Sequence, residues 1–483
     1  MVSYLQFLGA TRTVTGSRHV LYHRGKVVLM DCGLFQGLKE LRLRNWEPFP
    51  LPTGFVDDVV LSHAHIDHSG YLPRFGRHGF DGRIFATPST ADLCGIMLPD
   101  SAHIQEEDAK YANKEGFTKH EPALPLYTVK DAEQVLGQFH VVPLNQPFAI
   151  NRNVQFEFLE SGHILGSALT RVTLRREDET TFQILYSGDL GRYEEDLLPD
   201  PAAVSEADFL VLESTYGDRL HSENDVHQTL ADIISKTAAR RGVVVIPSFA
   251  VGRTQDLLFV LRQLQEAKRI PAIPVYIDSP LAIQATKIFC AHPEAFDPQN
   301  VPEAVNGDCS FLCHHLQLAS SVQDSMALNN MEGPFIIISA SGMCEAGRIL
   351  HHLKLKLPDP RNAVVFVGYQ AEGTRGRRLL DGEKEIKIHG VLVPVRAELH
   401  NIDALSAHAD YEEIFKWLSH FRKPPRMTFL VHGEQAQMEA LAGKIRERLG
   451  WPVTLPNYLD KVDLEKFLPP LAFPDPPGAA SLP

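Results

Sequence analysis

The sequence predicts an α/β protein of two or more domains, one of them built on a mainly parallel sheet. Its 483 residues exceed what one compact core usually needs. In roughly the first 200 residues, short apolar runs end in polar turns, which is typical of strands. From about residue 208 onward, apolar runs alternate with longer amphipathic stretches, and this alternation indicates βαβ units.

The composition is that of a globular protein, with 44% apolar and 22% charged residues. No apolar run approaches the roughly 18 residues of a membrane span, and the N-terminus lacks the pattern of a signal peptide. Six scattered cysteines therefore predict reduced thiols and a cytoplasmic location. The net charge of −13 excludes a protein that coats nucleic acid through a broad basic surface, but it allows a nuclease whose cations lie in one cleft.

Three predicted strands in the first region end at residues suited to chemistry. The run 26–30 (KVVLM) leads into Asp31, the run 59–62 (VVLS) leads into a histidine cluster, and the run 182–186 (FQILY) leads towards Asp189. A rigid strand holds the loop residue that follows it in a fixed place. We therefore expect functional side chains at these strand ends.

The stretch 208–392 has the alternation of a second α/β domain. A strand (427–431) and a helix (435–449) follow it, and the Pro/Gly/Ala-rich C-terminal residues predict a loose tail. The predicted strands of the stretch are 209–212, 243–246, 275–277, 335–338 and 364–367, and its predicted helices are 227–239 and 254–267.

The densest functional signal is the run 62–68 (SHAHIDH), which directly follows a predicted strand. It places four metal-binding side chains, His63, His65, Asp67 and His68, within six residues. Imidazole nitrogens and carboxylate oxygens bind zinc at about 2.0–2.2 Å. A tight turn can direct these side chains at two neighbouring ions. The alternative, a polar surface loop that happens to contain histidines, suits a lone histidine better than this spacing.

Two single residues could complete such a metal site. His163 lies in the run 160–168 (ESGHILGSA), where glycines let the backbone approach a ligand closely. Asp189 follows a predicted strand. Taken alone, each residue is more typical of a turn, but their order along the chain and their places at strand ends favour metal ligands.

The order of Asp31, the run 63–68, His163 and Asp189 resembles the metallo-β-lactamase superfamily. This resemblance implies an αβ/βα sandwich with the metals at one edge. It also implies that Asp31 orients ligands without binding metal itself. The implied cofactors are two Zn²⁺ per chain: His63, His65 and His163 hold the first, Asp67 and His68 hold the second, and Asp189 bridges both.

Three later motifs narrow the resemblance to the β-CASP nucleases, and the likeness covers about residues 1–455. Motif A is 213–217 (ESTYG), motif B is 406–411 (SAHADY) and motif C is 431–434 (VHGE). The implied domains are the first part of the metallo-β-lactamase domain (1–207), an inserted β-CASP α/β domain with a mainly parallel sheet (208–392), the second part of the metallo-β-lactamase domain (393–460), and a C-terminal extension (461–483).

The resemblance also assigns roles to the motif residues. It makes His432 the remaining ligand of the second zinc and His408 the general acid, with Glu213 orienting His408. Asp67 and Asp31 complete the catalytic set. The alternative for His408 is a buried histidine that serves packing alone.

A histidine in motif C resembles the RNA-cleaving branch, which includes ribonuclease J and the pre-mRNA 3′-end cleavage endonuclease; in the DNA-cleaving branch this position is typically valine. The chain looks most similar to short bacterial β-CASP ribonucleases. The implied reaction is zinc-dependent hydrolysis of RNA by a hydroxide that two metals prepare, leaving 5′-phosphate and 3′-hydroxyl ends. We expect an endonuclease, with exonuclease action left open.

Loops between predicted strands and helices of the second domain are the expected RNA-binding segments, because a helix N-terminus attracts phosphate. A single-stranded RNA is the expected substrate, and Phe249 could stack on a base, although core packing is an equal alternative. The patch formed by Arg375, Arg377 and Arg378 could be only a solvated face. The candidate substrate-binding residues are Phe249, Arg253, Ser341, Gly342 and Arg348.

Two other functions compete with a ribonuclease. A small-molecule ester or thioester hydrolase would use the same metals but would not need the inserted domain. A catalytically inactive scaffold would lack zinc ligands, whereas every ligand position is filled here. The pair Cys309 and Cys313 is a weak metal signal, and packing explains it better. The sequence is compatible with a homodimer.

Overall fold

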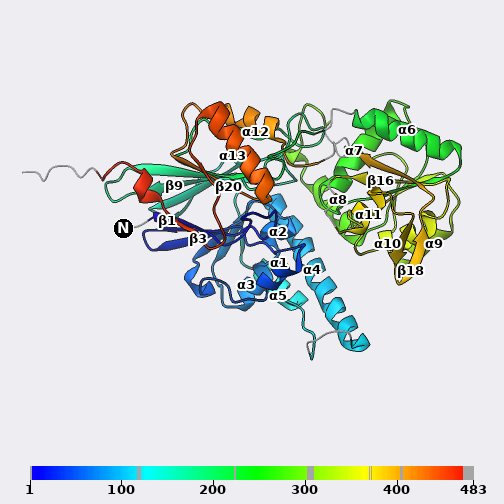
Figure 1. The fold of residues 1–483 in the computed structure, drawn as a ribbon, viewed down its shortest axis with the longest axis horizontal. Helices are drawn as coiled ribbons and strands as arrows, with labels where there is room; N and C mark the ends of the chain where they lie inside the picture. The colour runs from blue at the N-terminus through cyan, green and yellow to red at the C-terminus, as the bar shows by residue number, and fades with distance from the viewer. Residues whose placement is uncertain are drawn as a thin grey trace, which may run out of the picture.

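The computed structural model describes residues 3–116, 121–221, 225–301, 309–368, 370, 373–402 and 406–471. The expected loose tail falls mostly at 472–483, outside the described residues. Figure 1 shows two lobes: a sandwich that contains both ends of the described chain, and an α/β lobe beside it. In the part of the chain that is described, no helix combines the length and apolarity needed to cross a membrane.

The sandwich contains two mixed seven-stranded sheets that pack face to face. The first has the order β22-β1-β2-β3-β4-β5-β6 and the second has the order β21-β20-β11-β10-β9-β8-β7. The strands of the first sheet are β1 (Ser3–Phe7), β2 (His19–His23), β3 (Lys26–Met30), β4 (Asp58–Val60), β5 (Arg83–Ala86), β6 (Phe139–Val141) and β22 (Lys461–Asp463). The strands of the second are β7 (Phe148–Asn151), β8 (Val154–Glu160), β9 (Ala168–Arg175), β10 (Thr181–Tyr186), β11 (Phe209–Glu213), β20 (Met427–Val431) and β21 (Val453–Thr454).

Apolar side chains from both sheets, such as Phe7, Val28, Phe156 and Ile184, form the core between them. Helices cover the two outer faces (Figure 1), which completes an αβ/βα sandwich and confirms the predicted fold class. On one side lie α1 (Lys39–Arg44), α2 (Ile66–Ser69), α3 (Leu72–Arg77), α4 (Pro88–Glu115) and α5 (Val129–Leu136), and on the other lie α12 (Tyr411–Leu418) and α13 (Gln435–Leu449).

The second lobe is built on a six-stranded parallel sheet of order β14-β13-β15-β12-β16-β19, and the predicted parallel sheet is therefore confirmed. A small antiparallel hairpin of β17 (Glu385–Ile388) and β18 (Val391–Pro394) lies outside that sheet. The sheet strands are β12 (Val243–Pro247), β13 (Val275–Ile277), β14 (Leu316–Leu318), β15 (Phe335–Ser339), β16 (Ala363–Val367) and β19 (Glu398–Ile402). Its helices are α6 (Val226–Ala239), α7 (Arg253–Glu266), α8 (Pro280–Ala291), α9 (Val322–Asn330), α10 (Ile349–Lys356) and α11 (Arg375–Leu380).

The strand pairing differs from the expected domain limits of 208 and 392 at both ends. β11 pairs in parallel with β10 and β20, so it belongs to the sandwich. β19 pairs in parallel with β16, so it belongs to the inserted domain. Local apolar patterns cannot show this, because they do not indicate which sheet a strand joins.

Cys290 and Cys309 form a disulfide, so the expectation that all six thiols are reduced is wrong. The aromatic rings of Phe289, Phe296 and Phe311 pack together and bring the two segments into contact. Cys290 and Cys309 are 19 residues apart in the sequence, and this spacing gave no indication of their contact. Cys309 is thus not available as a partner of Cys313 for a metal.

Candidate metal centre and cleft

The predicted metal ligands come from four separated segments that meet at one edge of the sandwich. The run 62–68 follows β4, and His163 lies in the turn between β8 and β9. Asp189 follows β10, and His432 follows β20. His432 has a positive φ of 49°, a backbone conformation that non-glycine residues rarely adopt. Side chains more than 360 residues apart in the chain, such as those of His68 and His432, therefore lie in contact.

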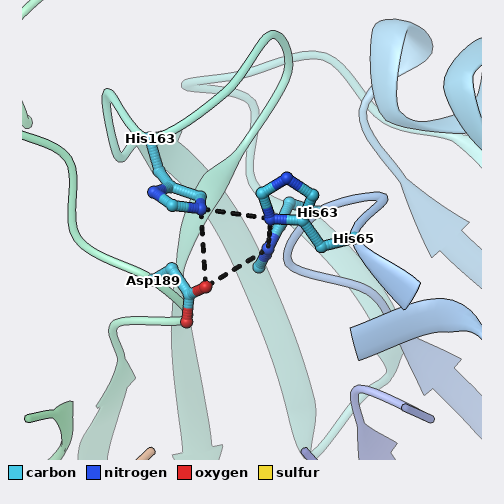
Figure 2. Close-up of side chains that lie close together, drawn as sticks. All are labelled: His63, His65, His163 and Asp189. Atoms are coloured by element: carbon cyan, nitrogen blue, oxygen red, sulfur yellow. Dashed lines mark hydrogen bonds and ion pairs between the residues drawn. The ribbon is translucent and has the colours of Figure 1, made fainter. Parts of the chain in front are cut away.

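One cluster contains His63, His65, His163 and Asp189, whose side chains point toward one another in Figure 2. The Nδ1 atom of His65 lies 3.1 Å from Nε2 of His63 and 3.2 Å from Nε2 of His163. The Oδ2 atom of Asp189 lies 3.4 Å from Nε2 of His63 and 3.5 Å from Nε2 of His163. Three imidazole nitrogens and one carboxylate oxygen thus surround a common point.

The second cluster contains Asp67, His68 and His432. The Nε2 atoms of His68 and His432 are 3.1 Å apart, and Nε2 of His432 lies 3.3 Å from Oδ2 of Asp67. The other carboxylate oxygen of Asp189, Oδ1, lies 3.2 Å from Nε2 of His68. Asp189 therefore presents one oxygen to each cluster.

Protonation favours cation binding at the first cluster. Burial and the neighbouring imidazoles hold the pKa of His63 and His163 well below the usual value, and burial lowers the pKa of His65 to about 4. These imidazoles are neutral near pH 7, which is the form that binds zinc. Burial opposes ionisation of Asp189, but the surrounding histidines hold its pKa well below the usual range. In the part of the chain that is described, the buried Oδ1 atom of Asp189 accepts no hydrogen bond, which is what a metal-binding oxygen would show.

Asp31 lies behind the second cluster and orients it. Its carboxylate contacts Nδ1 of His68 at 2.7 Å, so Nε2 of His68 faces the cluster. The backbone N–H and the hydroxyl of Ser62 donate to the same carboxylate at 2.7 and 2.8 Å, and the hydroxyl of Tyr186 donates at 2.6 Å. This arrangement is the kind that fixes the orientation of a metal-binding histidine.

Backbone and hydroxyl oxygens orient two further ligands. Nδ1 of His163 lies 3.1 Å from the carbonyl oxygen of Ala407. Nδ1 of His432 lies 3.1 Å from the hydroxyl of Thr215. Because Nδ1 is engaged in each case, Nε2 is left to face the cluster.

His408 and Glu213 form a pair beside the first cluster. Nδ1 of His408 lies 3.1 Å from Oε1 of the fully buried Glu213. The backbone N–H of Leu190 donates to the same oxygen, and the His408 and His163 ring centres are 4.5 Å apart. Burial opposes the charged imidazole, but the Glu213 carboxylate outweighs burial and raises the pKa of His408 to about 9. His408 is therefore protonated at neutral pH.

A cavity of about 400 Å³ opens over both clusters, between the sandwich and the inserted domain. The sandwich side supplies His65, Asp67, His163, His408 and His432. The inserted domain supplies Phe249, Val251, Arg253, Met343 and Gly368. A substrate in this cavity would therefore contact both domains.

Two of the five predicted substrate-binding residues, Phe249 and Arg253, line the cavity. Phe249 is 43% exposed, and its ring lies against Gly342, where a Cβ atom would be 3.0 Å from the ring. The guanidinium of Arg253 is paired with Asp256 at 3.0 Å.

Of the other three predicted residues, Ser341 and Arg348 make contacts within the inserted domain. The hydroxyl of Ser341 accepts from the backbone N–H of Glu345. The guanidinium of Arg348 is held by the buried Asp278 at 2.7 Å and donates to the carbonyl of Ala319. The sequence showed that Arg348 lies near a strand end but not that a buried carboxylate faces it.

Three residues that support the site were not singled out from the sequence: Tyr186, Thr215 and Ser62. Thr215 lies inside motif A, Ser62 directly precedes the candidate ligand His63, and Tyr186 ends β10 three residues before Asp189. Their positions in the sequence, next to the motif residues, could have identified them. Their hydrogen-bond partners could not be predicted, because these depend on how the two sheets pack.

Three family models match the chain in succession. The metallo-β-lactamase superfamily model matches residues 15–84, the Beta-Casp domain model matches residues 254–379, and the model described as a Zn-dependent metallo-hydrolase RNA specificity domain matches residues 392–456. The first match falls on the sandwich and the second on the inserted lobe, and the third runs from β18 and β19 of the inserted lobe back into the sandwich.

Ribonuclease TTHA0252 of Thermus thermophilus is 37% identical over 451 residues, which cover 93% of this chain and 97% of that protein. Transcription termination factor FttA of Pyrococcus abyssi is 33% identical over 478 residues, covering 95% of this chain and 70% of that longer protein. A crystal structure of a protein of unknown function from Enterococcus faecalis V583 shares the fold, with a TM-score of 0.53, 13% identity, and coverage of 96% of this chain and 100% of that one. The chain thus belongs to the β-CASP family of metal-dependent hydrolases within the metallo-β-lactamase superfamily.

Proposed function

We propose that this chain is a zinc-dependent ribonuclease that hydrolyses phosphodiester bonds of single-stranded RNA. The observation that carries the proposal is the sharing of Asp189 between two ligand clusters on the floor of a cavity, with the protonated His408 beside them. Ribonuclease TTHA0252, which matches almost the whole chain, supports RNA as the substrate.

We propose two Zn²⁺ per chain, one held by each cluster. His63, His65 and His163 would hold one ion, and Asp67, His68 and His432 the other, with Asp189 contacting both. The donor set of imidazole nitrogens and carboxylate oxygens fits zinc. Zinc, when bound, lowers the pKa of water towards about 7 and offsets negative charge on the phosphate.

The remaining chemistry falls to His408 and Glu213. Glu213 engages Nδ1 of His408, so Nε2 is the atom that would donate a proton to the departing 3′ oxygen. The products would then carry a 5′-phosphate and a 3′-hydroxyl. Asp31 would act on the metal site indirectly, by holding the imidazole of His68 in place.

Substrate binding is proposed at the wall of the inserted domain. The exposed ring of Phe249 would stack on a base, and stacking suits unpaired RNA because every base has a π-face. Ser341 and Gly342, which lie beneath the ring of Phe249, would border the surface along which the RNA phosphates lie. Arg253 is paired with Asp256, and Arg348 is paired with Asp278. Each arginine would act by holding the conformation of the strand-to-helix loop in which it lies.

The ester or thioester hydrolase alternative is not favoured, because the matching RNA specificity domain model and the similar ribonuclease TTHA0252 point to an RNA-directed hydrolase. Purified protein incubated with end-labelled RNA and the matching DNA, with and without a chelator, tests the proposal. We expect RNA cleavage that chelator stops and zinc restores. Cleavage of generic esters without cleavage of RNA would overturn it.

We further propose a cytoplasmic location, where RNA substrates are abundant, and a homodimer. Cell fractionation tests the first proposal. Light scattering of the purified protein tests the second, with twice the chain mass of 53.9 kDa expected.

A further inference from the structure

His221 lies outside every motif that identified the site, yet it contacts the backbone of the proton donor. It follows motif A by four residues, and its side chain is 4% exposed. Nε2 of His221 donates a hydrogen bond to the carbonyl oxygen of His408 at 2.8 Å. The backbone N–H of His221 donates to Oδ2 of Asp410 at 3.0 Å.

The acceptor fixes the protonation of His221. A carbonyl oxygen can only accept, so Nε2 must carry hydrogen. Burial, and then the charge of Arg192, lower the pKa of His221, so the ring is neutral near pH 7. Asp410 and Glu413 also face it, the latter with an oxygen 3.9 Å from Nε2. The ring is therefore a fixed donor at physiological pH.

His408 is consequently held at two points. Glu213 engages its imidazole at Nδ1, and His221 engages its backbone carbonyl. Tyr216 strengthens this connection: its backbone pairs with Asp410, and its ring centre lies 4.7 Å from that of His221. Motif A and motif B are thus linked around the proton donor.

A metal site at His221, Asp410 and Glu413 explains these contacts less well. The three side chains lie close enough for one ion, but each already has a protein partner. His221 donates to a carbonyl, Asp410 accepts from the backbone N–H of Glu413, and Glu413 is paired with Arg192.

We propose that His221 is a positioning residue for the proton donor: its Nε2–H bond to the His408 carbonyl holds the imidazole of His408 where Nε2 can reach the leaving 3′ oxygen. This inference rests on the proposed role of His408. It predicts that loss of the His221 N–H slows only those reactions in which the leaving group needs a proton.

The test compares H221F, H221Q and H408A on two substrates. One is an RNA oligonucleotide, whose 3′ oxygen must be protonated. The other is the p-nitrophenyl ester of uridine 5′-phosphate, whose leaving group departs as an anion. H221F cannot donate, whereas the glutamine of H221Q retains an N–H. H420F is the matched control, because Nδ1 of His420 also bonds a carbonyl, that of Trp417, away from the cavity.

We expect H221F to lower kcat on RNA by about 10- to 100-fold, at or below the lower end of the roughly 100- to 10,000-fold range of general-acid effects, because His221 acts only through His408. KM and zinc content should stay near wild type, and the rate on the nitrophenyl ester should change less than about threefold. H221Q should recover most of the RNA activity, and H420F should match wild type. If H221F does not fold, H221M replaces it in the same comparison.

Three results separate failure of this inference from failure of the proposed function. If H408A slows both substrates equally, His408 is not the proton donor, and the roles proposed for His408 and His221 fall together while the ribonuclease proposal stands; absence of RNA cleavage by the wild type would overturn the proposed function. If H408A spares the nitrophenyl ester but H221F slows both substrates equally, or H221Q is as slow as H221F, only the role of His221 is overturned.

Discussion

Oδ1 of Asp189 lies 3.2 Å from Nε2 of His68, while Oδ2 of the same carboxylate faces His63 at 3.4 Å. One side chain therefore connects two groups of imidazoles. The carboxylate is buried, and among the described residues Oδ1 accepts no hydrogen bond, so a cation held between the clusters would offset its charge.

D189N should abolish RNA cleavage and reduce bound zinc, since the amide supplies neither the charge nor the second anionic oxygen that the clusters share. Zinc content by mass spectrometry of metals, measured with the cleavage rate, checks this. D81N, at an exposed aspartate just before β5, is the control and should behave as wild type. Full zinc content and full activity in D189N would remove Asp189 from the metal centre.

E213Q should move the alkaline limit of cleavage to lower pH. The pKa of His408 is raised to about 9, above the usual value of about 6.5. The charged imidazole is therefore present below about pH 9 and is lost above it. Its contribution to the free energy of unfolding is complete below about pH 6.5 and is lost as the pH rises through about 9. Single-turnover rates of RNA cleavage, measured from about pH 6 to about pH 10, should show the alkaline limit in the wild type. An alkaline limit that stays at the same pH in E213Q would contradict the pairing of Glu213 with His408.

Y186F should weaken zinc binding at the second cluster. The variant removes the hydroxyl that donates to Asp31 at 2.6 Å and leaves the backbone and hydroxyl of Ser62 in place. Loss of such an outer partner typically costs about 10- to 100-fold in metal affinity. Competition with a chromogenic chelator measures this. Y22F, on a tyrosine that stacks on Tyr4 far from the cluster, is the control, and equal affinities of both variants would argue against the Asp31 network.

F249A should raise the KM for RNA by about 5- to 150-fold, the equivalent of about 1–3 kcal/mol for one stacked base. F249W should keep most of the affinity. F55A removes a phenylalanine that is 69% exposed and lies outside the cavity, and it should leave KM unchanged. Steady-state kinetics on one oligonucleotide compares the three, and similar KM values for F249A and F55A would place base stacking elsewhere.

The sequence by itself predicted the candidate metal ligands and the fold class. Four of the candidate ligands fall within His63–His68, and the other three, His163, Asp189 and His432, lie in turns that follow strands, so residue type and spacing together with the family resemblance predicted them. The alternation of strands and helices similarly predicted the parallel sheet, because apolar periodicity is a local property of the chain.

Only the tertiary structure decided which distant groups meet. It assigned β11 to the sandwich and β19 to the inserted domain, joined Cys290 to Cys309, and turned Arg348 toward Asp278. It also set Tyr186 against Asp31 and His221 against the His408 carbonyl. Each of these contacts depends on how sheets and loops pack across long stretches of chain, and no local pattern of residues encodes that packing.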